Sequence, residues 1–527
     1  MIIPVSGLGQ VGILTDGPKE KFPLNAWTAG RNVRFHDGAV EKMQGHIEVY
    51  ATPLNPPWWL FPIARAGNYF WLYAGDTKVG ATDGATHADI TRVAGNYTTD
   101  LNVGWTGTSI EGIPVITNGT EVPQMWSPPA LATKLIALTA WPGTYTCRAM
   151  KSLKRYLVAL FVIKAGVQNP YMIKWSHQAP TNGVPASWDE TDPTIDAGEW
   201  TLPTDGGFIV DGAPLRDDLI IYKEYQTWKM QYAAGVDIFR FTKAFDSFGA
   251  VSRRCAVEFF TGRQLVFTGD DIVLHDSQQA KSLINERLKT ALVGTIDTTY
   301  FARSFVVINY AKFEVWVCFP ETGQSSCTKA LVWNWINDTW GFRDLPNTGF
   351  IAAGIVSPIV TSETWAGAVG TWADDPDVWG DRSYDPTKRQ MLMAAPVTTK
   401  LHQMDQTQQA DGVNMVSFVE RQSLGFPLKS DQPPDFTRMK QINTIWPQIK
   451  GTVGGVVNIY LGTQKRIDGP VVYSAARPYT IGTTEFIDTS DVEASRMHAL
   501  KFESTSNVEW KLGAYDADVV DRGIYYG

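Results

Sequence analysis

Cysteine and histidine are scarce in this chain, and their scarcity argues against a disulfide scaffold and a metal centre. The 527 residues include four cysteines, Cys147, Cys255, Cys318 and Cys327, and seven histidines. Four cysteines are too few to staple a chain of this length, so we expect reduced thiols. Neither residue type recurs at the short spacing of a zinc site. We therefore predict no metal and no cofactor.

Long apolar runs and a secretion signal are also absent from the sequence. No run of about 18 apolar residues is present, so we predict that this chain does not insert into a membrane. The opening residues 1–7 (MIIPVSG) lack a basic region followed by an apolar stretch, so we expect no signal peptide. These absences favour a soluble protein that is made and assembled in the cytoplasm.

Charge is sparse and its balance is acidic. Charged residues make up 19% of the chain, and the formal net charge is −8. A protein that grips nucleic acid tightly is usually basic, so this balance argues against tight DNA binding. The low charge content fits a protein with extensive interfaces better than a highly solvated monomer. The 20 tryptophans allow two interpretations, since large aromatic side chains concentrate in cores and at interface centres.

Two short motifs have the outward form of a functional site. Residues 7–12 (GLGQVG) have the spacing of a dinucleotide-binding fingerprint, but residues 16–18 (DGP) end regular structure where a helix is needed. We therefore expect these glycines to serve a flexible arm. Residues 194–200 (TIDAGEW) resemble the Asp-box turn of sialidase-type propellers, one residue short of its usual spacing. We predict an ordinary polar turn there.

Catalytic side chains form no recognisable group. No serine or cysteine lies in a nucleophile elbow, and we predict no catalytic, cofactor-binding or metal-binding residues. A pair of glycosidase carboxylates stays open, because acidic residues are plentiful. Residues 374–377 (DDPD) read as turn residues, with a calcium site as the alternative.

Glycine, proline and tryptophan are abundant, and they fit many short strands joined by tight turns. The clearest unit spans residues 305–345, where four short strands at about 305–309, 313–319, 329–335 and 339–343 alternate with turns. Four antiparallel strands in about 40 residues match one blade of a β-propeller. Similar units begin near Trp58, Val103, Lys151, Gly207, Ala256, Phe305 and Phe350, at a period of roughly 45 to 50 residues.

The predicted fold class is therefore all-β: a β-propeller of about seven or eight blades, a C-terminal β-sandwich-like domain and one inserted helix. The eighth blade depends on whether the hairpin around Asp37 and Gly38 completes a blade. We predict three regions: an N-terminal arm and first hairpin at residues 1–55, the propeller at 56–405 and the C-terminal β-domain at 406–527. The alternating strands after about Val416 supply the last of these.

Two segments interrupt the repeat. Residues 277–292 have apolar side chains at helical spacing, with Ser277 as the expected N-cap. The basic residues of this segment, Lys281, Arg287 and Lys289, face either a partner or the helix's own domain. Residues 365–382 carry three tryptophans at seven-residue intervals among aspartates, and we predict an ordered loop pinned by these aromatic rings.

Several segments resemble one family of viral proteins. Residues 25–38 (NAWTAGRNVRFHDG) resemble the opening of the tail nozzle and tail-tube (tubular protein B-like) proteins of short-tailed bacteriophages. Residues 331–345 (LVWNWINDTWGFRDL) look like a recurrent blade of these and of related phage DNA-stabilisation proteins. Residues 460–464 (YLGTQ) and 510–515 (WKLGAY) look like their terminal β-domain.

This resemblance implies a non-enzymatic, structural virion protein. It would form the nozzle or tube of the tail below the portal and adaptor, and line the channel through which the genome is retained and ejected. Its implied partners are copies of itself in a homohexameric ring, tail adaptor or head-to-tail connector proteins, and tail fibres or spikes. Double-stranded DNA would pass through transiently and without sequence specificity. The chain would reside in the virion tail after assembly in the host cytoplasm.

Charge and position suggest two further expectations within this interpretation. An acidic channel would repel phosphate, so that DNA slides instead of binding. The arm at residues 1–25 and the C-terminal sandwich are the candidate contacts with neighbours and the adaptor.

Two other functions remain open on the sequence alone. A glycan-binding or glycan-cleaving propeller, a lectin or glycoside hydrolase, would carry paired carboxylates and aromatic rings on one face. A generic intracellular scaffold propeller would be stable as a monomer without a viral partner.

Overall fold

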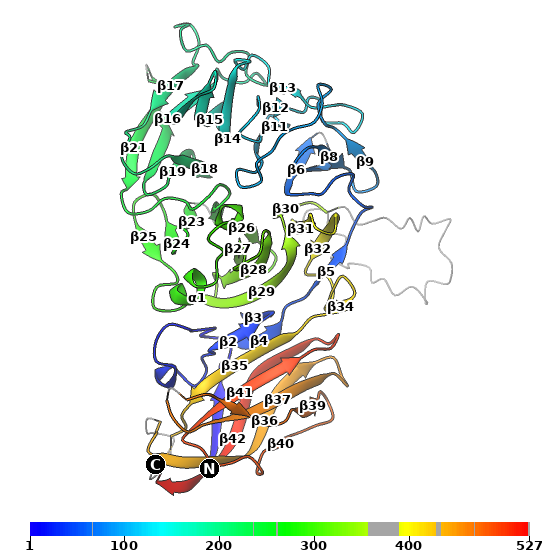
Figure 1. The fold of residues 1–527 in the computed structure, drawn as a ribbon, viewed down its shortest axis with the longest axis vertical. Helices are drawn as coiled ribbons and strands as arrows, with labels where there is room; N and C mark the ends of the chain where they lie inside the picture. Colours follow the sequence, from blue (N-terminus) through cyan, green and yellow to red (C-terminus); the bar gives the residue numbers. More distant parts are fainter. Residues whose placement is uncertain are drawn as a thin grey trace, which may run out of the picture.

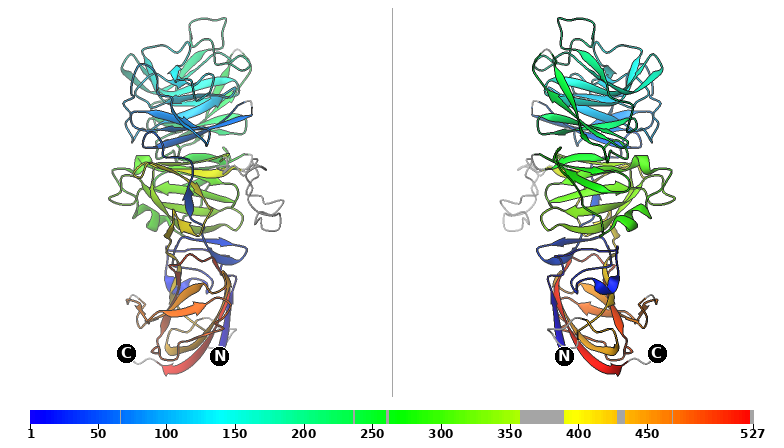
Figure 2. Two further views of the ribbon diagram at one scale, coloured as in Figure 1. Left: turned by 90° about the vertical axis from the view of Figure 1, so that its right-hand side faces the viewer. Right: turned by 90° about the vertical axis from the view of Figure 1, so that its left-hand side faces the viewer.

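The computed structural model of this chain describes all residues except 66, 236, 260–261, 357–388, 428–433, 468 and 525–527. The described chain forms a ring of sheets above a two-layered sandwich (Figure 1). Side views show that the sandwich continues the long axis of the molecule below the ring (Figure 2). Helix in the described residues is confined to α1 (Lys289–Val293) and the 3-10 turns η1 (Lys19–Lys21) and η2 (Phe301–Arg303).

The ring is a β-propeller. Six of its blades are four-stranded antiparallel sheets whose strands follow chain order. The first strands of successive blades pack against one another around the axis, from β10 round to β6. The six blades are β6 (Trp59–Arg65), β7 (Asn68–Ala74), β8 (Val79–Thr82) and β9 (His87–Asp89); β10 (Thr106–Ile110), β11 (Ile113–Thr117), β12 (Gln124–Met125) and β13 (Ile136–Ala137); β14 (Tyr145–Leu153), β15 (Tyr156–Lys164), β16 (Val167–Trp175) and β17 (Gly198–Thr201); β18 (Ile209–Leu215), β19 (Asp218–Lys223), β20 (Thr227–Tyr232) and β21 (Phe239–Phe245); β22 (Ala256–Phe259), β23 (Arg263–Phe267), β24 (Ile272–His275) and β25 (Ala280–Ser282); and β26 (Phe305–Asn309), β27 (Glu314–Phe319), β28 (Cys327–Asn334) and β29 (Thr339–Thr348).

The seventh blade closes the ring with strands from distant parts of the chain. It contains β30 (Phe350–Gly354), β31 (Gln390–Ala395), β32 (Lys400–Met404) and then β5 (His46–Glu48), with β33 (Gln409–Ala410) and β34 (Val413–Asn414) at its edge. β5 pairs antiparallel with β32, placing Glu48 opposite His402. The ring therefore closes by hydrogen bonds between an N-terminal strand and a strand near residue 400. Because β5 pairs with β32, the outer edge of β32 is not left unpaired.

Two six-stranded sheets form the sandwich. One runs β3 (Val33–His36), β4 (Ala39–Lys42), β42 (Trp510–Ile524), β36 (Arg438–Gly451) and β40 (Ile487–Asp488), and β1 (Ile2–Ser6) also pairs with β42. The other runs β2 (Ala29–Arg31), β35 (Ser417–Leu424), β41 (Met497–Ser504), β37 (Val456–Gln464) and β38 (Val472–Tyr473), with β39 (Arg477–Thr480) on β37. Both long strands of the first sheet show the alternating burial of a strand with one face on a core.

One hydrophobic core runs from the sandwich into the propeller. Phe502 and Trp510 of the sandwich belong to the same buried cluster as Trp333 and Trp340 of the sixth blade and Phe259 of the fifth. Relative motion is the default between domains unless their interface is large and apolar. The continuous core therefore favours a fixed angle between the two parts.

The predicted blade positions are confirmed, and the number of blades is seven in the described chain. The seven first strands begin within six residues of the predicted unit starts. The hairpin around Asp37 does form, as β3 and β4, but it joins the sandwich. The three-residue strand β5 completes the seventh blade instead, so no eighth blade arises.

The predicted helix at residues 277–292 is wrong except at its end. Ser277 has a positive φ of 76° and lies in a turn, β25 follows it, and α1 spans only five residues. The apolar side chains that suggested a helix, Leu283, Ile284, Leu288 and Leu292, are all buried in the main core. Tertiary packing thus buries these side chains although most of the segment is not helical. The helical spacing of apolar residues in the sequence is therefore misleading here.

Residues 1–25 do not form a free arm. β1 pairs with β42 over its whole length, and Leu8 and Ile13 are fully buried. A Cβ added to Gly9 would lie 2.2 Å from the carbonyl oxygen of Ala39, so this glycine permits a close backbone approach instead of flexibility.

The other predicted boundaries also change. β33 and β34 extend the seventh blade to Asn414, so the strands of the C-terminal half of the sandwich begin at β35. The predicted loop at residues 365–382, with the calcium alternative at 374–377, lies outside the described residues.

Candidate functional site at the junction

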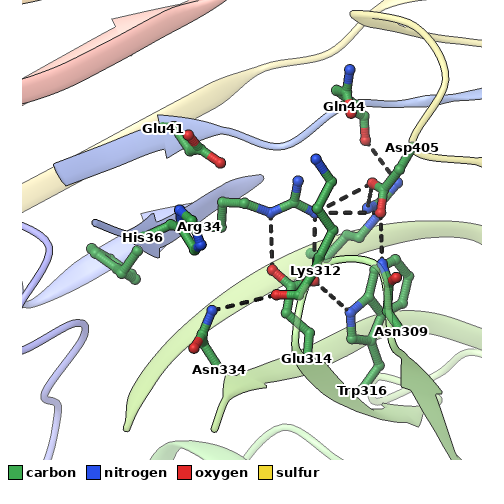
Figure 3. A network of polar contacts seen from close by, with 12 residues as sticks. Arg34, His36, Glu41, Gln44, Asn309, Lys312, Glu314, Trp316, Asn334 and Asp405 are labelled. Carbon is green, nitrogen blue, oxygen red and sulfur yellow. Dashed lines mark hydrogen bonds and ion pairs between the residues drawn. The ribbon is translucent and has the colours of Figure 1, made fainter. Parts of the chain in front are cut away.

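Buried charges gather where the sandwich meets the sixth and seventh blades. Arg34 of β3 donates from Nε to Glu314 Oε1 at 2.9 Å and from Nη2 to Glu314 Oε2 at 3.4 Å (Figure 3). Its Nη2 also reaches Asp405 Oδ1, directly after β32, at 3.3 Å. No more than 10% of any of these three side chains is exposed. Three segments that are distant in sequence therefore meet at one guanidinium.

A second arginine completes this group, which we call the junction network: Arg34, Glu314, Arg343 and Asp405. Arg343 of β29 donates from Nη1 to Asp405 Oδ1 at 2.7 Å and from Nη2 to the carbonyl oxygen of Gln44 at 2.8 Å. Two guanidinium groups thus face two carboxylates, and the charges balance. A buried ion pair is tolerated when its geometry is good and the remaining polar atoms are satisfied.

Neighbouring groups satisfy the remaining oxygen atoms of the network. Trp316 donates its indole N–H to Glu314 Oε2 at 2.9 Å, and Asn309 donates to Asp405 Oδ2 at 2.7 Å (Figure 3). The guanidinium of Arg343 also lies over the Trp316 ring, 4.4 Å from its centroid. These contacts hold the charged side chains in fixed positions.

Arg34 and Asp405 stay charged at neutral pH. Burial raises the pKa of Asp405, but the positive charges of Arg34 and Arg343 outweigh it and lower that pKa to about 2. Burial likewise lowers the pKa of Arg34, and the carboxylates of Glu314 and Asp405 raise it above its ordinary value. Neither group is poised to exchange a proton near pH 7, so the arrangement is suited to fixing structure and not to acid–base catalysis.

Backbone contacts reinforce the junction beside the network. Asn32 donates its N–H to the carbonyl oxygen of Phe342 at 2.8 Å, and Ile13 donates to that of Trp340 at 3.2 Å. A Cβ added to Gly341 would lie 2.7 Å from the carbonyl oxygen of Val33. The outer strand of the sixth blade and the sandwich therefore approach closely along several residues.

A pair of histidines lies in the closing strand of the ring. His46 of β5 and His402 of β32 have ring centroids 4.8 Å apart. Burial lowers the pKa of His46 to about 3 and also lowers that of His402. Lys400 and Asp411 flank the pair and form an ion pair at 2.7 Å. Both imidazoles are buried, and they are neutral at physiological pH. They pack against each other where β5 pairs with β32, so we assign them a structural role in closing the seventh blade.

The histidines, cysteines and acidic residues of the described chain bear on the sequence predictions about metal and thiol chemistry. No group of three or more His, Cys, Asp or Glu residues there is arranged to hold a metal ion. The four cysteines are buried and unpaired. Asp196 of the predicted polar turn accepts a hydrogen bond from the hydroxyl of Tyr156 at 2.9 Å.

Sequence reasoning missed the junction network. Arg34, Glu314 and Arg343 each lie within a strand, and the residue that follows each of them on the chain is buried or half-buried. A charged residue in such a strand is the available signal, because an unpaired buried charge is costly and must find a partner. The identity of the partner is not visible in the sequence, since the paired residues are between 62 and 371 positions apart. In the described residues, no helix is long and apolar enough to span a bilayer.

No protein-family model and no curated protein sequence matches this chain. Among solved structures, it is similar to the WD40 β-propeller domain of Doa1, with a TM-score of 0.33, 9% identity, and coverage of 72% of this chain and 95% of that one. It is also similar to YCF48 bound to D1 peptide, with a TM-score of 0.37, 11% identity, and coverage of 69% and 96%. At these scores the similarity adds nothing to the fold assignment, which rests on the seven sheets themselves.

Proposed function

We propose that this chain is a structural component of the tail of a short-tailed bacteriophage, in which copies form a nozzle or tube around the channel for the genome. The observation that supports this most is the junction network together with the continuous core beside it. A subunit that builds a ring needs a fixed angle between its parts, because a loose joint would let neighbouring copies lose register. The sequence resemblance to nozzle proteins supplies the viral context.

The sandwich is the proposed contact with neighbours and with the adaptor. The N-terminus and the end of β42 lie at its far end from the propeller (Figure 1), where the terminal amine of Met1 contacts Asp518 at 3.0 Å. Apolar side chains protrude from its loops and edges: Val453 is 82% exposed, Val472 65% and Phe486 51%. Residues 1–25 contribute through the sandwich surface, because they are packed into it. The proposed assembly is a homohexameric ring, with connector proteins, fibres or spikes around it.

Electron microscopy of the purified chain, alone and mixed with the portal and adaptor of the same virus, tests this proposal. Rings of the chain, or rings that appear only on the portal–adaptor complex, are the expected result. Single elongated particles under both conditions would contradict it. A lumen lined by rings of Lys and Arg would contradict the narrower proposal that DNA slides through an acidic channel.

Glycan binding is the second candidate function, and one observation favours it. Trp200 on β17 is 52% exposed and stacks on Phe241 of β21 with the ring planes 4° apart. A flat, exposed aromatic face of this kind suits contact with the apolar face of a sugar ring. A glycan-binding screen with wild-type protein and Trp200→Ala decides this alternative: binding that disappears in the variant would support it, and no binding would remove it.

A further inference from the structure

Four arginines gather at one end of the propeller axis. Arg148 lies on β14, Arg253 and Arg254 lie three and two residues before β22, and Arg303, at the end of η2, lies two residues before β26. All four are at or near the entry ends of first strands, and these ends share one face of a propeller because each blade begins on the same side. We call this group the arginine mouth.

Contacts between segments of different blades bring these side chains together. Arg253 donates from Nη1 to the carbonyl oxygen of Arg148 at 2.6 Å, and Arg303 donates from Nε to Asn102 Oδ1 at 3.0 Å. The Nη2 atom of Arg254 lies 3.0 Å from the position of a Cβ added to Gly104. Arg254 and Arg303 therefore meet at the loop that leads into β10, and Arg253 joins Arg148 of another blade.

None of the four guanidiniums forms an ion pair within the described residues. The carboxylates that act on them electrostatically are Asp100, Asp211 and Glu224, and Asp211 is already paired with Lys151 at 2.8 Å. The Nε atom of Arg254 is buried without a hydrogen-bond partner. The mouth thus carries more positive charge than its own carboxylates neutralise, in a chain whose net charge is −8.

Aromatic rings pack on the guanidiniums of Arg148, Arg254 and Arg303, and the Nε–H of Arg254 stays unused. Arg148 lies 3.8 Å from the centroid of Phe161, and Arg254 lies 5.2 Å from that of Phe350. Stacking fixes the plane of a guanidinium while its N–H edge stays available for an oxyanion. Burial, together with the neighbouring charges of Arg254 and Arg148, lowers the pKa of Arg253 to about 9, the direction expected where positive charges are gathered.

A small recess marks where such an anion would enter. It is a cavity of about 10 Å³ lined by Arg254, Arg303, Trp58, Trp59 and Trp105. That volume is about the size of one water site. It fits one oxygen atom of a planar carboxylate between two guanidiniums.

We propose that the arginine mouth binds a carboxylate group presented by a protruding acidic loop or chain end of a protein partner. Arginine and carboxylate are matched in shape, and two parallel hydrogen bonds can form between them. This inference does not depend on the viral role, since it rests on the propeller alone.

Duplex DNA is the poorer occupant. Its phosphates lie on a broad convex surface, so their oxygen atoms cannot enter a recess walled by three tryptophans. It also carries one negative charge per about 1.7 Å of axis, so the acidic chain as a whole repels it more strongly than a single carboxylate. The predicted partner is therefore a protein.

Fluorescence anisotropy with a labelled hexaglutamate peptide, on the full chain at low salt, tests the proposal. We expect binding that weakens about tenfold in Arg254→Gln and by less in Arg254→Lys, which keeps the charge but loses the planar fork. Arg240→Gln, which removes an exposed arginine of β21 far from the mouth, should leave the affinity unchanged. Near-ultraviolet circular dichroism of each variant checks that the fold is retained.

Other outcomes would overturn the proposal. Absence of peptide binding to the wild-type chain would do so, as would an equal loss of binding in Arg240→Gln. A 20-base-pair duplex that displaces the peptide and depends equally on Arg254 would identify a phosphate site instead. If Arg254→Gln does not fold, the wild-type titration, the duplex competition and Arg254→Lys still decide between these outcomes.

Discussion

Arg34 and Glu314 are separated by 280 positions in the chain, yet they share two hydrogen bonds inside the junction, at 2.9 and 3.4 Å. The exposed fractions of their side chains are 4% and 0%. One residue comes from a sandwich strand and the other from the sixth blade, so this pair can form only after both parts have folded and docked. The stability of the pair and the angle between the two parts are therefore linked.

Removing one charge of this pair should destabilise the whole chain. Glu314→Gln keeps the shape of the side chain but leaves Arg34 short of negative charge in a buried site. We expect a loss of about 3 kcal/mol in the free energy of unfolding. Urea unfolding followed by tryptophan fluorescence measures this loss.

The matched control is Arg31→Gln in the same junction. Arg31 is 50% exposed and pairs with Asp344 at 2.5 Å, and exposed pairs contribute less than about 1 kcal/mol. If Arg31→Gln and Glu314→Gln lower the free energy of unfolding by the same amount, burial does not make the junction network more important for stability than an exposed ion pair. That result would contradict our interpretation.

Acid should destabilise the closing blade through His46. The folded pKa of His46 is about 3, below the unfolded value of about 6.5. The unfolded chain therefore binds a proton first as the pH falls, and stability is lost from about pH 6.5 downwards. For His46 alone the loss between pH 7 and pH 5 is about 2 kcal/mol.

The variant His46→Asn isolates this effect. Its midpoint of thermal unfolding should fall less between pH 7 and pH 5 than that of the wild-type chain, because one titrating group is removed. Equal pH dependence in both proteins would show that His46 is not held neutral in the folded state.

The blade closure should also be sensitive to one glycine. Gly45 lies between β4 and β5, and a Cβ added to it would be 1.9 Å from the carbonyl oxygen of Gln409. Gly45→Ala should therefore lower the free energy of unfolding by about 1–3 kcal/mol. Gly143→Ala is the control, since nothing lies within 4 Å of its added Cβ, and it should have almost no effect. Equal behaviour of the two variants in urea unfolding would contradict the described approach of the chains.

Thiol reactivity reports on the integrity of the propeller. All four cysteines are buried, and burial raises the pKa of Cys147 and of Cys255 to about 12. Because the thiolate is the reactive form, a thiol-specific reagent should leave the native protein unmodified at pH 8. Four thiols should react in 6 M urea. Rapid modification of the native protein would contradict the described burial.

Most of the propeller could be predicted from the sequence because its signals are local. Each blade is a run of adjacent antiparallel strands, so alternation of apolar residues and turn residues is sufficient to locate it. The unit that begins at Phe305 illustrates this: its first two strands, β26 and β27, lie within one residue of their predicted starts. The longer sandwich strands, such as β36 and β42, were visible for the same reason.

The closure of the ring and the composition of the sandwich could not be predicted, because their pairings are distant. β5 has three residues, too few to show a period, and its partner β32 is more than 350 positions away. β1 pairs with β42 across almost the whole chain. No local pattern specifies such partners: the predicted hairpin within residues 1–55 forms, but this region joins the sandwich and the seventh blade and is not separate.

The junction network and the arginine mouth could not be predicted for a related reason. A charged residue inside a strand signals at most that a partner is needed, and which other charges the fold brings near it is not a local property of the sequence. The guanidinium of Arg34 pairs with two carboxylates, whereas the Nε atom of Arg254 has no hydrogen-bond partner in the described residues. The sequence shows both arginines, but it does not show that one is paired with carboxylates and the other is not.

The most direct test of the proposed structural role is electron microscopy of virions from the source that encodes this chain, labelled with gold-conjugated antibody against the sandwich. The proposal predicts gold at the tail, below the portal, on every intact particle. Unlabelled particles, with the protein recovered only in the soluble fraction of the infected cells, would contradict it.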